Sequence, residues 1–288
     1  MTADHGRLRQ SDGTESGDDT YEVVIVRYGT RQANRSDVFL NYSVYGEPDG
    51  PIGMDYFFWL VRNDARTIVV DTGFSRAGGD ARGRTMLLDP REAFAALGVD
   101  PADEPTVVVT HAHYDHIGNL AHFDRSPIVV ARQEVEFWTG PHARRRQFHH
   151  SVEDDELRTL RAVVDEGRAR LFDDRYTPAD GVEVLRVGGH TPGQSVVVVR
   201  TTDGPVLLAS DAVHYYEEYE RDMPFVNAAS LVDMYAGFDT LRGMLDGGVA
   251  RHFVTGHDPG TLERFGQEDG PLPGASCCIG ARPSVGTP

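Results

Sequence analysis

Four short strand-like segments of this 288-residue chain are each followed, within three residues, by a histidine or an aspartate. This recurrence constrains the fold more than any other feature. The apolar segment TVVVT (106–110) leads into HAHYDH (111–116), which holds three histidines and an aspartate in six residues. The other three segments lead to His190, Asp211 and His257. Short apolar runs predict buried strands, and loops at strand ends commonly carry functional side chains. The sequence therefore predicts strands whose ends bring these side chains together.

The HAHYDH segment offers metal donors in two directions. His111 and His113 are two positions apart, so on an extended or turning segment both can point the same way. Asp115 and His116 would lie at the start of a helix and face a second point in space. Nitrogen ligands with a few carboxylates suit zinc, although iron, manganese and cobalt also accept them. We therefore expect a metal centre at this loop, completed by donors from the other strand ends.

Between residues 21 and 266, short strands alternate with turns and helices and predict one α+β domain. We expect strands over 21–28, 56–62, 67–71, 106–110, 128–131, 182–187, 195–200, 206–210 and 252–254, and helices over 90–97, 153–166 and 231–245. This order indicates two sheets packed face to face with helices outside. Residues 1–20 and 267–288 are polar or rich in glycine and proline, and they predict disordered, flexible tails. Cys277 and Cys278, in the second tail, imply neither a disulfide nor a metal site.

The composition narrows the class of partner. The formal charge of −17 disfavours a nucleic-acid backbone as the partner, because polyanions repel one another. No apolar run is long enough to cross a bilayer, and the first residues lack the apolar core of a secretory signal. The sequence therefore predicts a cytoplasmic enzyme that acts on a small molecule, with no nucleic-acid or membrane partner and with a homodimer left open.

The motifs HAHYDH, GGHTPG, VLLASDA and TGHDP follow VDTG (70–73) in an order that resembles the metallo-β-lactamase superfamily. The resemblance implies an αββα sandwich, in which two packed mixed sheets are flanked by helices. It also implies two Zn²⁺ ions, one held by three histidines and one by an aspartate and two histidines, with another aspartate bridging both. In this sequence these ligands are His111, His113 and His190, then Asp115, His116 and His257, and finally Asp211. Asp71 would orient one of the ligating histidines.

The resemblance also narrows the reaction. The bridging Asp211 disfavours true β-lactamases, which generally lack that carboxylate, and the VDTG element and closing GHDP are most similar to the N-acyl-homoserine lactonase group. This implies a metal-dependent hydrolase that opens a lactone by attack of a metal-bridging hydroxide, with Asp115 passing a proton to the leaving oxygen. The alternatives are a thioester hydrolase of glyoxalase II type, another ester hydrolase, a nuclease of the superfamily and a non-catalytic metal-binding protein.

The sequence departs from the lactonase pattern at one position. The tyrosine that follows the bridging aspartate by three residues in the best-known lactonases is His214 here, with Tyr215 next to it. Either His214 or Tyr215 donates to the substrate carbonyl, or the substrate differs. Tyr114 is a further pocket candidate. The basic segment 142–150 is either a solvated loop or a lid that helps to hold a carboxylate or acyl substrate.

Overall fold

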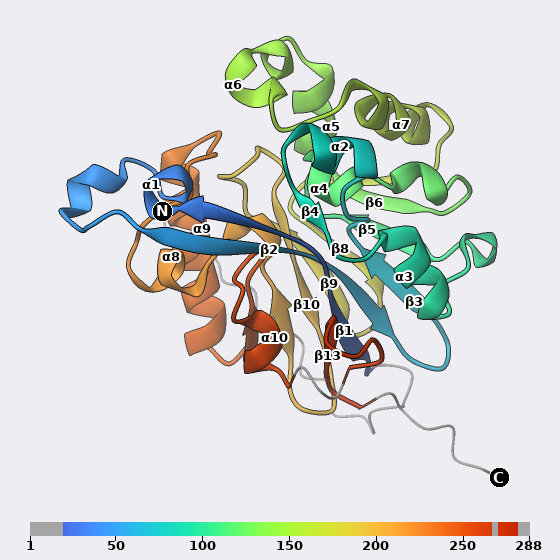
Figure 1. Cartoon of the computed structure of the whole chain (residues 1–288). Helices are drawn as coiled ribbons and strands as arrows, with labels where there is room; N and C mark the ends of the chain where they lie inside the picture. Colours follow the sequence, from blue (N-terminus) through green and yellow to red (C-terminus); the bar gives the residue numbers. More distant parts are fainter. Residues whose placement is uncertain (1–19, 267–269, 282–288) are drawn as a thin grey trace, which may run out of the picture.

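The computed structural model describes residues 20–266 and 270–281, whose strands form two sheets (Figure 1). The larger sheet has the order β13-β1-β2-β3-β5-β6-β7, with β4 paired to β1. Its strands are β1 (Glu22–Asn34), β2 (Pro51–Arg62), β3 (Thr67–Val70), β4 (Thr85–Met86), β5 (Thr106–Val109), β6 (Ile128–Ala131), β7 (Ala169–Phe172) and β13 (Ser276–Ile279). The smaller sheet, in the order β12-β11-β10-β9-β8, contains β8 (Arg175–Ala179), β9 (Val182–Arg186), β10 (Ser195–Val199), β11 (Val206–Leu208) and β12 (His252–Val254).

Both sheets are mixed. In the larger sheet β3, β5, β6 and β7 run parallel, whereas β13, β1, β2 and β3 pair antiparallel. In the smaller sheet β11 and β12 pair parallel, and the remaining pairs are antiparallel. A hairpin turn that contains Asn63 and Asp64 joins β2 and β3, which pair antiparallel from Trp59↔Val70 to Arg62↔Thr67.

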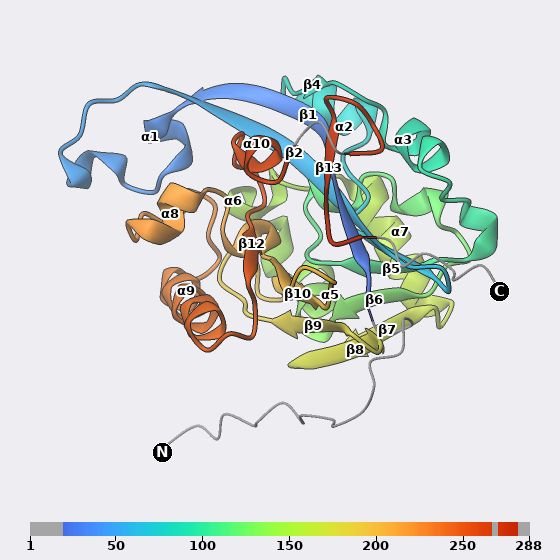
Figure 2. The same cartoon turned by 90° about the horizontal axis from the view of Figure 1, so that it is seen from below.

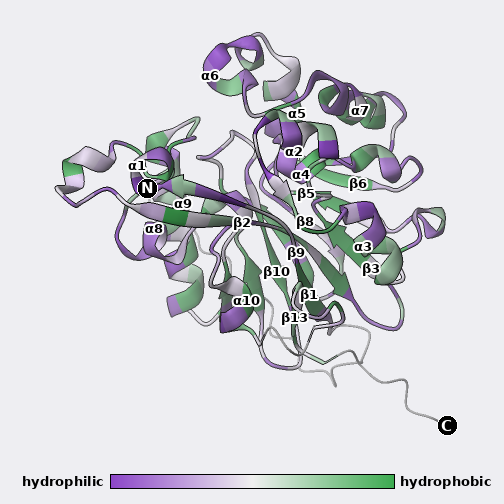
Figure 3. Cartoon of the chain, in the orientation of Figure 1, coloured by the Kyte–Doolittle hydropathy of each residue, from purple (hydrophilic) through white to green (hydrophobic). Residues whose placement is uncertain are grey.

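The central strands are buried on both faces, which explains why they read as continuous apolar runs. In β1, Val23 and Ile25 lie in the core between the two sheets, whereas Val24 and Val26 lie in the core under the helices. This alternation follows from the two-residue period of a strand. Figure 3 shows these strands as mainly hydrophobic ribbons inside helices of mixed polarity. Burying one aliphatic side chain contributes about 1.5–3 kcal/mol, so the inter-sheet core is a major source of stability.

Helices cover the outer faces of the two sheets (Figure 2). Side chains of α3, α5 and α7 join the core on the larger sheet, and side chains of α9 join the core on the smaller sheet. The helices are α1 (Arg35–Val38), α2 (Arg76–Ala81), α3 (Pro90–Ala96), α4 (Tyr114–Ile117), α5 (Arg132–Thr139), α6 (Arg146–His149), α7 (Asp154–Asp165), α8 (Tyr216–Glu220), α9 (Leu231–Asp246) and α10 (Thr261–Arg264). The predicted αββα sandwich is therefore confirmed.

Sequence signals account for the helix starts. Helix α3 begins after Asp89, whose side chain accepts a hydrogen bond from the Arg91 amide, and Pro90 occupies its first turn. Helix α9 begins after Ser230, whose hydroxyl accepts from the Asp233 amide. The helices predicted over 90–97, 153–166 and 231–245 correspond to α3, α7 and α9. None of the helices in the described ranges is long and apolar enough to cross a membrane.

The prediction of a flexible C-terminal tail is wrong for part of residues 267–288. Strand β13 pairs antiparallel with β1 from Val23↔Ile279 to Val26↔Ser276, and the Cys277 side chain lies in the core between the sheets. A four-residue strand surrounded by glycine and proline gives no local signal, because its partner lies about 250 positions earlier in the chain. Cys277 and Cys278 are both free, as predicted. Residues 1–19, 267–269 and 282–288 of the predicted tails lie outside the described residues.

Candidate metal centre

The seven predicted metal ligands meet at one edge of the sandwich. His111 and His113 follow β5, and Asp115 and His116 lie in α4, the short helix that continues the same loop. The other three ligands lie after β9, in the 3₁₀ turn after β11 and after β12, and they are His190, Asp211 and His257. All seven side chains are buried. Strands far apart in the sequence therefore deliver their terminal side chains to one buried point.

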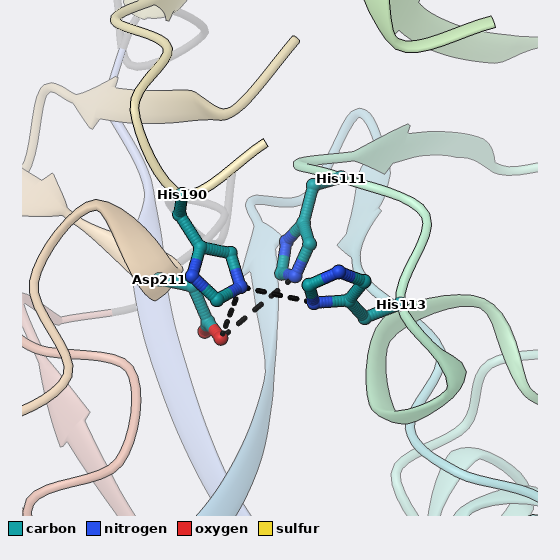
Figure 4. A group of neighbouring side chains, drawn as sticks. All are labelled: His111, His113, His190 and Asp211. Carbon is teal, nitrogen blue, oxygen red and sulfur yellow. Dashed lines mark hydrogen bonds and ion pairs between the residues drawn. The ribbon is translucent and has the colours of Figure 1, made fainter. Parts of the chain in front are cut away.

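Four of these residues form a first group. His111, His113, His190 and Asp211 each offer one ligand atom, and these atoms all lie within 4.8 Å of one another. Nε2 of His190 is 2.9 Å from Nδ1 of His113 and 3.3 Å from Oδ2 of Asp211. Figure 4 shows the three rings and the carboxylate pointing toward a common centre.

Asp115, His116 and His257 form a second group with the same spacing. Asp211 also reaches this group, because its Oδ1 is 3.2 Å from Nε2 of His116 and 3.0 Å from Nε2 of His257. One carboxylate thus faces the first group with Oδ2 and the second group with Oδ1. This is the arrangement required of an aspartate that bridges two cations.

The donor atoms fit metal ions because several of them have no other partner. Among the residues that the structure describes, Nε2 of His111, His116 and His257 and Oδ1 of Asp211 are buried without a hydrogen-bond partner. An unsatisfied buried polar atom costs about 1–3 kcal/mol, and four of them in one cluster are a large cost unless a cation binds there. Nitrogen and carboxylate donors in this number suit Zn²⁺.

The opposite ring nitrogens fix the tautomers of these histidines. Nδ1 of His190 is 2.7 Å from the Asn227 carbonyl oxygen, and Nδ1 of His257 is 2.7 Å from the Asp55 carbonyl oxygen. A carbonyl oxygen only accepts, so Nδ1 carries the proton and Nε2 directs a lone pair into the centre. Nδ1 of His116 lies 2.7 Å from Oδ2 of Asp71 and donates to that carboxylate.

Asp71 lies where an orienting residue must lie. Its carboxylate accepts from the Thr110 amide at 2.9 Å and from the Thr110 hydroxyl at 2.7 Å, in addition to His116. The backbone of Asp71 adopts a positive φ of 60°, which aspartate tolerates better than most residues. At the opposite side Gly256 is required, because a Cβ there would lie 2.9 Å from Oδ1 of Asp211 and 2.7 Å from the Ser210 carbonyl oxygen.

The pKa values of the histidines in the metal centre shift in two opposite directions. Burial lowers the pKa of His111 and His113 well below the usual range, and it lowers the pKa of His190 to about 3. These rings are therefore neutral at neutral pH, as metal ligands must be. Burial also opposes protonation of His116, but the nearby carboxylates, Asp211 foremost, raise its pKa well above the usual value. Burial favours a neutral Asp211, yet the surrounding histidines, His257 first, hold its pKa well below the usual range.

His214 and Tyr215, the two candidates for contact with the substrate, do not line the cavity at the centre. The His214 ring is buried and stacks on Phe225 with ring centroids 3.7 Å apart. Its Nε2 is 3.1 Å from Oδ2 of Asp211, and its Nδ1 is 3.1 Å from Oε2 of Glu218. Burial opposes its protonation, but these two carboxylates raise the pKa of His214 to about 9. The Tyr215 ring packs against Phe39, and its buried hydroxyl has no partner among the described residues.

The cavity beside the metal centre has a volume of about 270 Å³. His113, Asp115, His190 and Asp211 form its floor, and the surrounding walls include Arg31, Tyr56, Arg84, Tyr114 and His150. The predicted pocket residue Tyr114 therefore lies in the wall. Of the basic segment 142–150, only His150 is part of this wall.

Glu134 was missed by the sequence reasoning. This fully buried carboxylate of α5 accepts from the Ala112 amide at 2.7 Å and the Trp138 indole at 2.7 Å through Oε1. Through Oε2 it accepts from the Thr191 hydroxyl at 2.7 Å and the Gly193 amide at 2.9 Å. It thus connects the HAHYDH loop to the GGHTPG turn. A glutamate in an amphipathic helix is normally predicted to be exposed to solvent. No local sequence signal therefore indicates that Glu134 is buried beside the metal centre.

The fold and the site together define an αββα protein with a histidine- and aspartate-rich metal centre at its strand ends. The family model described as the metallo-beta-lactamase superfamily matches residues 54–237. The chain therefore belongs to the metallo-beta-lactamase superfamily, and the fold predicted from its motifs is confirmed.

Within this family the chain is similar to several lactonases. It is 30% identical over 272 residues to the N-acyl homoserine lactonase AttM of Agrobacterium fabrum, covering 84% of this chain and 95% of that protein. A quorum-quenching N-acyl homoserine lactone lactonase of known structure superposes with a TM-score of 0.70 at 21% identity, over 84% of this chain and 94% of the other. The structure of AidC, a dizinc quorum-quenching lactonase, superposes with a TM-score of 0.65 at 19% identity, over 91% and 94% of the two chains.

Proposed function

We propose that this protein is a dinuclear zinc hydrolase that opens the ring of a lactone, either an N-acyl-homoserine lactone or a related one. The observation that carries the proposal is Asp211, whose two oxygens face two separate groups of buried histidine and aspartate donors. The similarity to the lactonase AttM over most of both chains supports hydrolysis of the cyclic ester bond of a lactone as the reaction.

In this proposal His111, His113 and His190 would hold one zinc ion, Asp115, His116 and His257 would hold the other, and Asp211 would be a ligand of both. When bound, two zinc ions supply Lewis acidity and lower the pKa of water toward 7. Asp71, Asn227 and Asp55 keep the histidine rings in the orientation that directs Nε2 inward. The carboxylate of Asp115, at the cavity floor, would first accept the proton that the attacking water gives up and then pass it to the leaving oxygen when the ring opens.

The hydroxyl groups of Tyr56 and Tyr114 are the donors best placed for the substrate carbonyl. They lie 3.4 Å apart in the cavity wall. Burial raises the pKa of Tyr56 to about 12 and the pKa of Tyr114 well above its usual value. Both groups therefore remain protonated at neutral pH and can donate to a developing oxyanion.

The proposed partners follow from charge and surface. A chain with a formal charge of −17 repels nucleic acid, so we propose a small-molecule substrate and no nucleic-acid partner. We also propose a cytoplasmic enzyme without a membrane partner. A homodimer is compatible with the exposed apolar side chains Leu231 and Val232 at the start of α9. Light scattering coupled to size-exclusion chromatography measures that oligomeric state directly.

The proposal is tested by metal analysis together with a substrate panel. We expect two zinc ions per chain and turnover of lactones in preference to thioesters. Asp211→Asn should lose bound zinc and reduce kcat/KM at least about a hundredfold, because the bridging charge and part of the transition-state stabilisation disappear together. The control Asp239→Asn changes an exposed aspartate of α9 and should behave as wild type. Full turnover by Asp211→Asn, or faster turnover of a glyoxalase-II-type thioester, would refute the proposal.

A further inference from the structure

Two arginines line the cavity from neighbouring segments: Arg31 lies in β1, and Arg84 directly precedes β4. Strands β1 and β4 pair antiparallel with Gly29 opposite Met86 and Thr30 opposite Thr85. Continuing this register by one residue places Arg31 opposite Arg84, and both side chains line the cavity beside the metal centre. Like charges directly opposite each other on adjacent strands are destabilising. The pair is therefore a cost to the fold that needs an explanation.

No carboxylate of the described residues lies within ion-pair distance of either guanidinium. Nε of Arg84 donates to the Tyr114 hydroxyl at 3.0 Å, and its Nη1 donates to the Arg82 carbonyl oxygen at 2.8 Å. Nε of Arg31 contacts Sδ of Met54 at 3.1 Å. These partners are neutral, so neither guanidinium has a direct ion pair, and Asp115 acts on Arg84 only at longer range.

Arg82 lines the same cavity but has a structural role, because partners within the protein use its charge and its hydrogen-bond donors. Its guanidinium pairs with Glu153 and donates to the carbonyl oxygens of Gly78, His150 and Val152. Its charge is neutralised and its donors are used within the protein. Arg31 and Arg84 lack both features, although acidic side chains outnumber basic ones by 45 to 28 in this chain.

The remaining charged groups of the cavity wall do not offset the pair. Asp37 is exposed, and its Oδ2 accepts from the amide and the side chain of Asn34. Asp115 and Asp211 belong to the metal donors, and the remaining titratable residue of the lining is His150. The free cations thus lie in the wall of the cavity whose floor is the metal centre.

We infer that the substrate carries a carboxylate, in addition to its lactone ring, and that Arg31 and Arg84 bind this carboxylate. The inference rests on the proposed lactone hydrolysis and names its substrate class. A planar guanidinium matches a carboxylate geometrically, and two guanidiniums can both donate hydrogen bonds to one carboxylate between them. The volume of about 270 Å³ lies at the small end for ligand pockets, so a short carboxylate-bearing acyl group fits better than a long alkyl chain.

Calorimetry on the zinc-loaded protein tests this inference without relying on turnover. The probes are ring-opened N-acyl-homoserines with acyl chains of increasing length, each ending either in a methyl group or in a carboxylate. The members of a pair differ only in the terminal charge. We expect wild type to bind one or more of the carboxylate-ended probes about tenfold more tightly than the methyl-ended partner, as for a partly exposed charge-assisted hydrogen bond. This preference should weaken in high salt.

Variants separate binding from folding. Arg84→Gln and Arg31→Gln should each remove most of the preference, because each should weaken binding of the carboxylate-ended probes much more than binding of the methyl-ended probes. Arg84→Lys keeps the charge and should retain part of the preference. The control Arg158→Gln removes an exposed arginine of α7 and should change neither affinity. Equal wild-type affinity for both members of every pair, or an equal loss for both in Arg84→Gln and Arg31→Gln, would overturn the inference.

The corresponding lactones distinguish this failure from failure of the proposed function. If neither type of lactone is hydrolysed but the binding preference exists, the lactonase proposal fails and the carboxylate site stands. If both lactones are hydrolysed with equal kcat/KM and their products bind equally, the lactonase proposal stands and the carboxylate site is rejected.

Discussion

At the scale of single residues, His214 links the metal centre to the interior. Its ring lies between two carboxylates, Asp211 on one side and Glu218 on the other. Glu218 is itself buried and also accepts from the backbone amides of His214, Tyr215 and Phe225. His214 is therefore placed to hold the Asp211 carboxylate in position, and the cavity wall offers other hydroxyl groups for contact with the substrate.

His214→Phe tests this positioning role. Phenylalanine can still stack on Phe225 but lacks both nitrogens, so the fold should persist while Asp211 loses a neighbour. We expect kcat/KM to fall about 10–100-fold with reduced zinc content, the usual effect of removing a group that orients a metal ligand. Tyr215→Phe removes a buried hydroxyl without a partner and should leave activity and zinc content near the wild-type values. Elemental analysis and steady-state kinetics on both variants check this, and the reverse ranking would contradict it.

The sequence alone allows the metal donors to be proposed because their signal is local. Three histidines and an aspartate in HAHYDH, and single donors after three further strands, can be read without knowing any contact. Arg31 and Arg84 could not be found in this way. Their proximity depends on the pairing of β1 with the two-residue strand β4, and in a chain rich in arginine neither position is unusual.

At the scale of elements, α5 organises two loops of the metal centre through Glu134. Its four hydrogen-bond partners are all donors, which requires an ionised carboxylate in spite of its burial. Gly193 belongs to the same contact, because a Cβ there would lie 2.3 Å from Cβ of Glu134. The loop with His111 and His113 and the turn with His190 are thus held at a fixed separation.

Glu134→Gln should therefore affect stability and metal binding together. In glutamine, an NH2 group replaces one of the two carboxylate oxygens, each of which accepts from two donors in Glu134. The two donors at that end lose their acceptor and remain buried, at a cost of about 2–4 kcal/mol. We expect a melting temperature lower by roughly 5–10 °C and weaker zinc binding. Glu136→Gln, on the exposed face of the same helix, is the matched control and should change neither. Calorimetric melting and zinc titration measure both effects; a Glu134→Gln protein as stable as the control would contradict this role.

The elements that could be predicted are those with a strong periodic or apolar signal. The apolar runs of β2, β5 and β11 and the capped helices α3 and α9 follow from local sequence. The short strands β4 and β13 do not, since two to four residues carry no periodicity and their partner β1 supplies the pairing. Tertiary contacts decide such segments.

At the scale of the whole molecule, β13 closes one side of the sandwich. It covers the edge of β1, and its Cys277 and Ile279 side chains complete the core between the two sheets near Val23 and Ile25. Without it, β1 would present unpaired amide and carbonyl groups at the sheet edge, which invites pairing with another chain. The last part of the chain therefore stabilises the first strand of the fold.

A chain ending at residue 269 tests this closure against a control ending at Ala281, which retains β13. Loss of β13 removes the Cys277 and Ile279 side chains from the core and leaves the edge of β1 unpaired. We expect a destabilisation of about 3–5 kcal/mol. The melting temperature should fall by roughly 5–15 °C. Because β1 then becomes an edge strand, light scattering should detect association on warming in the shorter chain and not in the control. Identical melting and scattering of the two chains would show that β13 contributes no stability, and the metal centre would then have to be held by the remaining strands alone.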